Sequence, residues 1–356
     1  MRPATIAGLV EAREGAAAAS SLLTACLADP FGYGRVIRNE SEEIVGIVEQ
    51  RDLGGHQESI REVNTGTYCF DAATLFAHLH RLTDHNAQGE YYLTDIIGVL
   101  RSEGHAVIGI ESVSHEETRG VNTRVQLASA SRELQRRINE AHMLAGVTMT
   151  DPDLVWVAPS VQLGRDVVLE PMTFLYGDTA VGERAVIGPS SRLLDSTVGE
   201  DAVIDSSVLR GVSVGAGATV GPMGFLRPGT VLATRAKTGA FVEVKNSTVG
   251  EGSKVPHLSY IGDANIGRDV NIGAGTVTCN YDGVSKHHTD IGDGAFVGSD
   301  TMLVAPVTIG EGAVTGAGSA ITKDVPAGAL GIERTEQRIV EGWVARERGA
   351  AAECER

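Results

Sequence analysis

The chain has 356 residues, enough for two domains, and its 46 acidic residues outnumber 30 Lys and Arg to give a formal net charge of −16. That charge argues against nucleic acid or an anionic membrane as the main partner, because both attract basic faces. The four cysteines are far apart and form no CxxC pair, and no apolar stretch is long enough to span a membrane, so we expect a cytoplasmic protein without a disulfide framework.

Residues 1–122 have the mixed pattern of an α/β domain. Helices are predicted over 5–18, 75–82 and 94–103, a strand and hairpin over 36–48, and a buried strand over 107–110. A further helix over 123–145 carries spaced apolar residues among Glu and Arg, and Asp151–Pro152 marks its end. We therefore expect residues 123–150 to link this domain to the next.

From residue 163 onward an aliphatic residue, often followed by glycine, recurs every six residues. The fourth residue after it is usually small, as at Ala185, Ala202 and Ala313. Three such hexads form one triangular coil of a parallel β-helix. The repeat comprises Leu163, Leu169, Leu175, Val181, Ile187, Leu193, Val198, Ile204, Val214, Val220, Leu226, Leu232, Ile291, Val297, Leu303, Ile309, Thr315 and Ile321.

An antiparallel sandwich with glycine turns is the alternative, but its strands would alternate at period two with irregular turns. The constant spacing favours a left-handed parallel β-helix over 151–325, on the order of nine coils at about 4.8 Å each. Residues 326–356 lose the repeat and become charged and alanine-rich. A short arm and a disordered tail are predicted there.

The repeat is interrupted at 279–290, where CNYDGVSKHHTD predicts a loop that projects from one face. Coils stack residues that are distant in sequence, so side chains before this loop can form one site. Arg and Lys can bind a phosphate, His can accept a proton, and Tyr and Asn can orient a sugar. The candidates are Arg227, Lys245, His257, Tyr260 and Asn271.

Each candidate has a simpler alternative, since an isolated Arg, Lys or His on a prism face is often only a solvated surface residue. The pair His287 and His288 raises the possibility of a metal site. We do not favour it, because no third histidine stands at coil spacing in the neighbouring hexads.

Several motifs together resemble the bacterial bifunctional family that combines N-acetylglucosamine-1-phosphate uridylyltransferase and glucosamine-1-phosphate N-acetyltransferase. In the repeat region they are GFLRPG (224–229), FVEVKNSTVG (241–250), PHLSYIGDANIG (256–267), NIGAGTVTCNYDG (271–283) and FVGSDTMLVAPVTIG (296–310). In the first domain they are GYGRVIRN (32–39), GIVEQRD (46–52), EVNTGTY (62–68), GEYYLTDI (89–96) and GVNTRVQL (120–127). The resemblance extends over nearly the whole chain.

For the β-helix the resemblance implies acetyl transfer from acetyl-CoA to the amine of glucosamine 1-phosphate. His257 matches the general base, Arg227 and Lys245 match residues that hold the sugar phosphate, and Tyr260 and Asn271 match residues on the sugar. The implied acetyl-CoA contacts are Ala274, Ser299, Ala317 and Arg334, together with Asn280 and Tyr281 on the loop that reaches toward a neighbouring subunit. The resemblance also implies a homotrimer whose sites lie between subunits.

For the first domain the resemblance implies a truncated, Rossmann-like nucleotidyltransferase. Gly34, Glu49 and Asn64 match sugar-nucleotide contacts, and Asn122 matches a magnesium ligand. The family's phosphate-binding glycine loop and first magnesium ligand have no counterpart here, so roughly the first hundred residues of its pattern are expected to be absent. On that basis uridylyl transfer from UTP is expected to be lost.

The predicted function is therefore acetyl transfer in UDP-N-acetylglucosamine synthesis for the cell wall. Two alternatives remain open: a hexapeptide acyltransferase for another substrate, and a non-catalytic prism that serves as an oligomerisation platform. A substrate panel separates the first, and His257→Ala tests the second.

Overall fold

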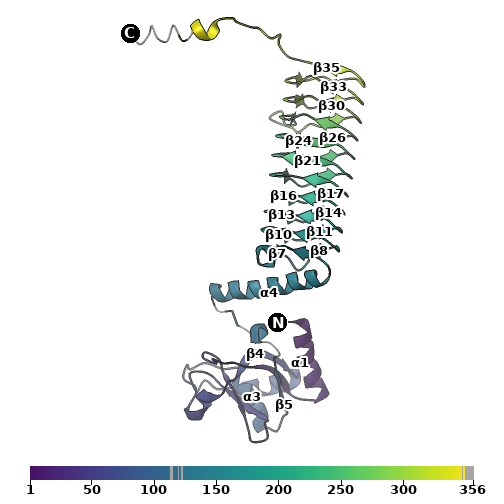
Figure 1. The fold of residues 1–356 in the computed structure, drawn as a ribbon. Helices are drawn as coiled ribbons and strands as arrows, with labels where there is room; N and C mark the ends of the chain where they lie inside the picture. The colour runs from purple at the N-terminus through teal and green to yellow at the C-terminus, as the bar shows by residue number, and fades with distance from the viewer. Residues whose placement is uncertain (113–114, 119, 122, 347, 349–356) are drawn as a thin grey trace, which may run out of the picture. The chain divides into compact units, whose positions relative to one another are not determined.

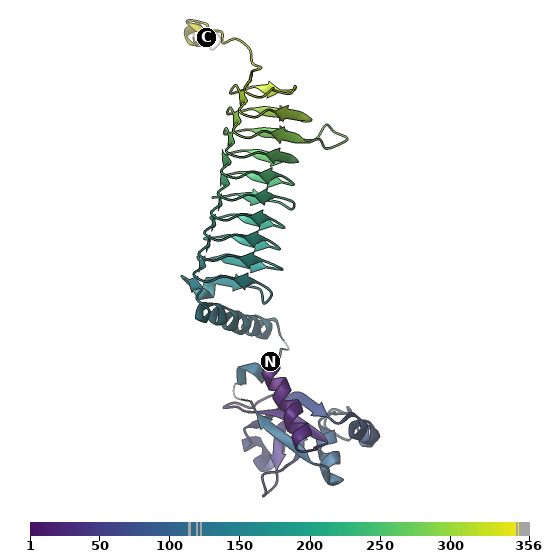
Figure 2. The ribbon, with the colours of Figure 1, turned by 90° about the vertical axis from the view of Figure 1, so that its right-hand side faces the viewer.

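The computed structural model describes residues 1–112, 115–118, 120–121, 123–346 and 348. These belong to two compact units, Met1–Glu133 and Leu134–Arg356. Figures 1 and 2 show that the first unit is a small α/β fold and the second a long stack of β-coils. Among the described residues, no helix has both the length and the apolar character needed to cross a membrane.

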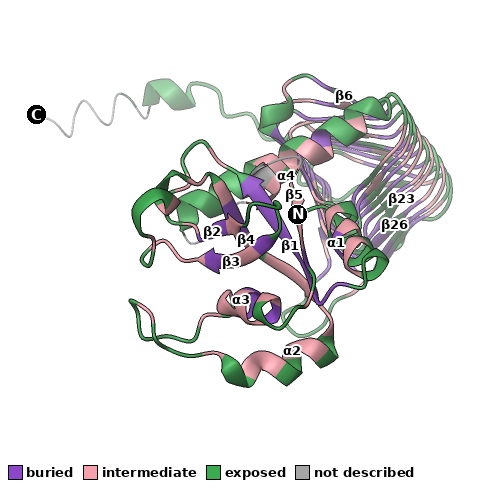
Figure 3. Ribbon diagram, turned by 90° about the horizontal axis from the view of Figure 1, so that it is seen from below, coloured by how far each residue is buried: buried purple, intermediate pink, exposed green. Residues whose placement is uncertain are grey.

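The first unit is built on a five-stranded mixed sheet with the order β3-β2-β4-β1-β5. Strands β1 and β5 are parallel, whereas β1 pairs with β4, β4 with β2, and β2 with β3 in antiparallel fashion. Strand β1, which lies between β4 and β5, is buried over six of its seven residues (Figure 3). The strands are β1 (Ser20–Cys26), β2 (Arg35–Arg38), β3 (Ile44–Val48), β4 (Glu62–Phe70) and β5 (Val107–Glu111).

Helices complete this unit. They are α1 (Pro3–Gly15), α2 (Ala72–His78) and α3 (Asp95–Ser102), with 3₁₀ turns η1 (Gly55–Ser59), η2 (Leu79–Arg81) and η3 (His115–Thr118). Helix α3 buries Ile96, Ile97 and Leu100 in a core that also contains Leu22 and Ile44. The predicted helices, hairpin and last strand are confirmed within a few residues, but the sequence reading missed β1 and β4.

Helix α4 (Arg124–Leu144) confirms the helix predicted over 123–145. Asn139 is buried on it, and its amide donates to the carbonyl oxygens of Pro152 at 2.8 Å and Val155 at 2.9 Å. Ile138 packs against the β-helix core. Since a buried amide needs partners, these bonds fix the C-terminal half of α4 against the first coil.

The second unit is the predicted left-handed parallel β-helix, with sheets of ten, nine and eleven strands. The ten-stranded sheet contains β7 (Val155–Val157), β10 (Thr173–Tyr176), β13 (Arg192–Leu194), β16 (Val208–Arg210), β19 (Phe225–Leu226), β22 (Glu243–Lys245), β25 (Tyr260–Gly262), β28 (Val277–Cys279), β31 (Met302–Val304) and β34 (Ala320–Ile321).

The nine-stranded sheet contains β8 (Gln162–Leu163), β11 (Ala180–Val181), β14 (Thr197–Val198), β17 (Ser213–Val214), β20 (Val231–Leu232), β23 (Thr248–Val249), β26 (Ala264–Ile266), β29 (Thr289–Ile291) and β32 (Val307–Ile309). The eleven-stranded sheet contains β6 (Thr148–Met149), β9 (Val168–Leu169), β12 (Val186–Ile187), β15 (Val203–Ile204), β18 (Thr219–Val220), β21 (Lys237–Ala240), β24 (Lys254–His257), β27 (Asn271–Ile272), β30 (Phe296–Val297), β33 (Val314–Thr315) and β35 (Leu330–Gly331).

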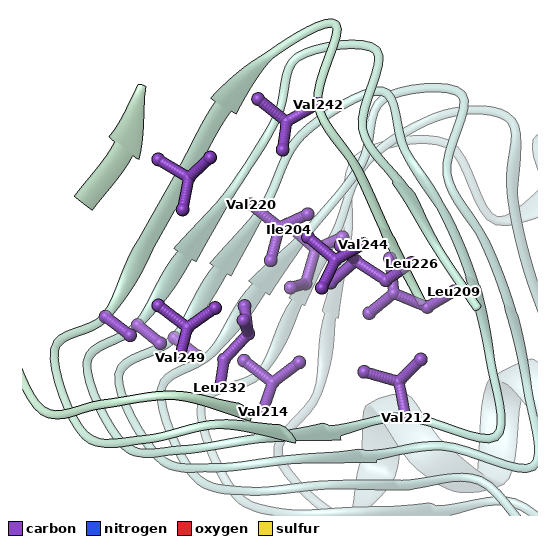
Figure 4. Packing of buried hydrophobic residues seen from close by; sticks show 14 of the residues in the cluster. Ile204, Leu209, Val212, Val214, Val220, Leu226, Leu232, Val242, Val244 and Val249 are labelled. Atoms are coloured by element: carbon purple, nitrogen blue, oxygen red, sulfur yellow. The ribbon is translucent and has the colours of Figure 1, made fainter. Parts of the chain in front are cut away.

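The predicted inward residues form the core of this stack. All the repeat residues named from the sequence are buried except Leu163, which is partly buried, and the small residues Ala185, Ala202 and Ala313 are buried too. Figure 4 shows the aliphatic side chains of successive coils lying over one another. The repeat also continues through positions not predicted from the sequence, including Thr238 and Thr278, which are buried threonines.

The stack extends beyond its predicted ends. Strand β6 begins at Thr148, and β35 pairs with β33 after the point where the hexads were expected to stop. The end of the predicted disordered tail, 349–356, lies outside the described residues.

The glycine that often follows the aliphatic residue has a steric role. At Gly182 an added Cβ would lie 2.7 Å from the backbone nitrogen of Glu200 on the next coil. Only a residue without Cβ allows the coils to approach so closely at this corner.

Candidate functional site

One outer wall of the β-helix carries most of the candidate residues. On its ten-stranded sheet Phe225, Glu243, Tyr260, Val277 and Met302 follow one another in register. These side chains are half-buried, while their inward neighbours fill the core. The wall thus presents a ladder of side chains from five consecutive coils, as the sequence predicts for stacked hexads.

A cationic edge borders this wall where the strands end. Arg227 directly follows β19, and its Nη1 donates to Glu243 Oε1 at 2.8 Å. Lys245 ends β22, and its Nζ lies 3.3 Å from Asp263 Oδ2. The hydrogen bond to Glu243 raises the pKa of Arg227. Both cations are therefore held in place by a carboxylate on the next coil.

Asp263 is the centre of this edge. It is buried, and its carboxylate accepts from Asn246 Nδ2 at 2.7 Å and Asn280 Nδ2 at 2.5 Å as well as from Lys245. Burial alone raises the pKa of Asp263, but the three hydrogen bonds outweigh it and bring that pKa below the ordinary value. The sequence reading did not single out Asp263, because its role depends on partners 17 or 18 residues away in both directions.

The predicted insertion forms a loop between β28 and β29 (Figure 2, yellow-green). Asn280 anchors its start, and an antiparallel bridge between Tyr281 and Lys286 closes it. Asp282 accepts from the backbone nitrogen of Ser285 at 2.7 Å and lies 2.7 Å from His287 Nε2. The loop is therefore an ordered turn, and Tyr281 and Lys286 are exposed on it.

Lys286 is a candidate that the sequence reading missed. Its hydrogen bond with Lys245 lowers the pKa of the Lys286 amine. The same hydrogen bond and the nearby Asp263 raise the pKa of Lys245. Arg227 also lowers the pKa of Lys286. Three basic groups thus converge, and a bound dianion would relieve their mutual repulsion. The sequence shows only that the insertion contains a lysine. The folded loop is what brings that lysine close to Lys245.

A second column of residues lies at the opposite edge of the wall, where the eleven-stranded sheet meets the ten-stranded sheet. Lys254, Asn271, Phe296 and Val314 pair in register on the eleven-stranded sheet. The residues three positions further along are His257, Ala274, Ser299 and Ala317, so they occupy one corner of successive coils. Arg334 joins this column because its Nη1 donates to the Ala317 carbonyl at 3.1 Å.

His257 and Tyr260 occupy different places in that geometry. His257 ends β24 and is exposed at the corner, whereas Tyr260 begins β25 on the wall. A Cβ added at Gly262 would lie 2.4 Å from the Tyr260 hydroxyl and 2.8 Å from Asn280 Nδ2. The absence of a side chain there leaves the space in which Tyr260 and Asn280 lie.

Asn271 is not brought onto the wall. It begins β27 on the adjoining sheet, where it is half-buried between Lys254 and Phe296. The structure therefore gathers Arg227, Lys245, Tyr260 and Asn280 at the wall, aligns His257 with Ala274, Ser299, Ala317 and Arg334 at its corner, and leaves Asn271 on a second face.

A separate group of polar residues lies in the first unit. The backbone nitrogen of Asn64 donates to the Gly34 carbonyl at 2.8 Å, and a Cβ on Gly34 would lie 3.2 Å from the Glu49 carboxylate oxygens. Thr94 donates to Glu49 at 3.0 Å, and burial raises the pKa of the neighbouring Tyr68 to about 12. The structure thus brings Gly34, Glu49 and Asn64 together, while Asn122 lies outside the described residues.

The chain is similar to several curated proteins called "Bifunctional protein GlmU". It is 51% identical to the one from Heliobacterium modesticaldum over 96% of this chain and 75% of that protein. It is 51% identical to the one from Mycobacterium tuberculosis strain H37Ra over 97% of this chain and 70% of that protein. The one from Corynebacterium diphtheriae is 47% identical over 98% of this chain and 72% of its own length.

The bacterial transferase hexapeptide (six repeats) pattern matches residues 288–323. Among solved structures, the Francisella novicida UDP-N-acetylglucosamine acyltransferase aligns with a TM-score of 0.34 at 15% identity, over 57% of this chain and 74% of that chain.

The matches to the curated proteins run over nearly the whole of this chain and over 70–75% of those proteins' own length. The prediction that about the first hundred residues of the family pattern are absent is not borne out by them. Loss of uridylyl transfer is likewise unsupported.

Proposed function

The chain belongs to the bifunctional GlmU family, and from that premise we propose that its β-helix transfers the acetyl group of acetyl-CoA to the amine of glucosamine 1-phosphate. One observation carries this proposal: a cluster of basic groups and an exposed imidazole flank the same wall. The strand between the two edges, Tyr260–Gly262, spans three residues. That is on the order of 10 Å, the size of an amino-sugar phosphate.

The cationic edge is the proposed phosphate site. Arg227, Lys245 and Lys286 offer charged donors, and Asp263 and Glu243 hold the first two in fixed positions. Charge-assisted hydrogen bonds to phosphate are among the strongest that side chains form. With the phosphate bound there, the sugar ring would lie along Tyr260. Its amine, on the carbon next to the one that bears the phosphate, would lie on the side of the ring that faces the His257 corner. Asn271 lies on another sheet, so we propose that it contacts the sugar in a neighbouring subunit's site.

His257 is the proposed general base. A neutral imidazole accepts a proton from the amine as the nitrogen attacks the thioester carbonyl carbon. A C–N bond forms, the C–S bond breaks, and the thiolate of CoA leaves and takes up a proton. We assign acetyl-CoA to the column of Ala274, Ser299, Ala317 and Arg334, with Asn280 and Tyr281 at its side, because this column leads along one corner to His257.

A homotrimer completes this proposal. A single wall leaves His257 and Tyr281 exposed, and an open face cannot enclose a ligand. Three copies arranged about an axis would place the site wall of each copy against a neighbour. Light scattering on the purified chain should give three times the monomer mass; a monomer with full activity would contradict the arrangement.

For the first unit we infer binding of a UDP-sugar by Gly34, Glu49 and Asn64. Glu49 is a ready acceptor for sugar hydroxyls, and the missing side chain at Gly34 opens the approach to it. Glu49→Gln should weaken binding of UDP-N-acetylglucosamine about tenfold in calorimetry, since a charge-assisted bond is lost. Glu58→Gln, at an exposed acid on η1, is the control. No step is assigned to magnesium, because Asn122 is outside the described residues.

The first experiment mixes the full chain with acetyl-CoA and glucosamine 1-phosphate and follows release of free thiol. Glucosamine 6-phosphate and serine serve as control acceptors. Release with glucosamine 1-phosphate alone supports the proposal. Release with serine favours another acyltransferase substrate, and no release from a folded trimer favours an oligomerisation platform.

A further inference from the structure

Two histidines and a glutamate converge in the first unit, and neither site described above uses them. His78 is the last residue of α2, and Glu103 and His105 follow α3. One ligand atom from each of the three residues lies within 4.8 Å of the others. His78 Nε2 is 3.1 Å from Glu103 Oε2, and the His78 and His105 rings meet edge to face with centroids 5.1 Å apart.

The backbone holds two of these residues rigidly. The Gly104 nitrogen donates to the Arg101 carbonyl at 3.1 Å, and the His105 nitrogen donates to the Leu100 carbonyl at 3.0 Å. With Gly104 at φ +82°, this is the Schellman arrangement that ends a helix. Glu103 and His105 therefore stand on either side of a fixed turn, and α2 brings His78 up to it, since α2 packs beside α3 (Figure 3).

The hydrogen bonding of His78 points its other nitrogen at the carboxylate. Nδ1 lies 2.6 Å from the Thr74 carbonyl oxygen, which can only accept, so Nδ1 carries a proton. Nε2 lies 3.1 Å from a carboxylate oxygen of Glu103, where it donates if the ring is an imidazolium and presents a lone pair if the ring is neutral. In the neutral ring, a cation held between the two acceptors would satisfy both. The arrangement of a histidine whose second nitrogen donates to a carbonyl is typical of metal ligands.

The carboxylate is also oriented by a neighbour. Arg81 pairs with Glu103 Oε1, which leaves Oε2 toward His78. The spacing suits a tetrahedral ion: with bonds of about 2.0–2.1 Å, ligand atoms of a zinc site are about 3.3 Å apart. His78 and Glu103 already have about that separation, and the ligand atoms of all three residues lie within 4.8 Å of one another.

We propose that His78, Glu103 and His105 bind a divalent transition-metal ion of the zinc type. Three protein ligands of nitrogen and oxygen leave a fourth position for water, as in open zinc sites. Bound there, the ion would tie the end of α2 to the turn after α3 and stabilise the first unit.

The test uses the full chain, stripped of metal with a chelator and then dialysed. Zn²⁺ is titrated by calorimetry, and Co²⁺ serves as a spectroscopic probe, because tetrahedral Co²⁺ has intense visible absorption. The parent should bind one tight equivalent, and His78→Gln, Glu103→Gln and His105→Gln should each weaken it by at least about tenfold. His80→Gln is the matched control, since His80 is an exposed histidine on the same segment.

Two further readouts keep the result interpretable. Circular dichroism confirms that each variant folds, and thiol release with glucosamine 1-phosphate should be unchanged, because the group lies outside the β-helix. The proposal is overturned if the parent binds no equivalent of Zn²⁺ tighter than millimolar. It is equally overturned if the three variants bind like the parent, or if His80→Gln loses the ion to the same extent.

Discussion

The two units build their polar sites in different ways. In the β-helix, Arg227, Lys245 and Tyr260 stand on successive coils and meet because every coil repeats the same path. In the α/β unit, Gly34 and Asn64 meet because β2 pairs with β4, with Glu49 just after the hairpin. In a solenoid the position of a residue thus follows from its spacing along the sequence. In a mixed sheet the position depends on the order of the strands, which no local repeat encodes.

Stacking also confines Gly262 of the β-helix more tightly than Gly8 of the α/β unit is confined. A Cβ on Gly262 meets two functional side chains, whereas a Cβ on Gly8 in α1 has no atom within 4 Å. Residues of a coil are confined from above and below, so a small change on one coil displaces its neighbours. The following variants test this contrast.

The largest effect is expected at the corner of the wall. His257→Ala should lower the rate of acetyl transfer by about 10²–10⁴-fold, the range typical of a lost general base. Because His257 is exposed, the thermal midpoint should stay unchanged. Thiol release measures the rate, and His56→Ala, at an exposed histidine of the α/β unit, is the control. Equal activity of both variants would remove His257 from the mechanism.

A smaller loss is expected at the cationic edge. Lys245→Gln removes one charged donor and should raise KM for glucosamine 1-phosphate about 10–100-fold, with little change in KM for acetyl-CoA. Lys237→Gln alters an exposed lysine on another sheet and should act like the parent. A parallel loss of affinity for both substrates would indicate structural damage rather than a lost phosphate contact.

The contrast in tolerance has its own test. Gly262→Ala should displace Tyr260 or Asn280, reduce acetyl transfer about tenfold and cost about 1–3 kcal/mol of stability. Gly8→Ala should instead stabilise the α/β unit by about 0.5–1 kcal/mol, because alanine favours a helix interior. Thermal unfolding monitored by circular dichroism measures both. If Gly262→Ala changes neither stability nor acetyl transfer, the space beside Tyr260 and Asn280 is not confined by the neighbouring coils.

The smallest effect concerns pH. The pKa of Asp263 is lowered in the folded chain, so the stability it contributes is present above its unfolded value and is lost as pH falls through its folded value. Asp263→Asn should therefore lower the thermal midpoint by a few degrees at pH 7. It should also remove part of the fall in the thermal midpoint that the parent shows between about pH 5 and 3. Asp269→Asn, at an exposed residue of similar φ, should leave that decline unchanged.

Sequence reading was strong where a repeat was present. The hexads predicted the β-helix, its inward aliphatic residues and its projecting loop, and the motifs led to the family. It missed β1, whose Ser20 and Ser21 conceal a strand that is buried on both faces. It also missed Asp263 and Lys286, because a turn aspartate and a loop lysine have no special pattern.

The sequence alone determined the coil architecture, since hydrophobic spacing acts over six residues and each coil repeats it. Tertiary structure decided which polar groups meet. Asp263 holds Lys245, Asn246 and Asn280 only because three coils are in register, and His78 faces Glu103 only because two helices end side by side. Hydrogen bonds and ion pairs act over a few ångströms in space, and that distance is unrelated to separation along the chain.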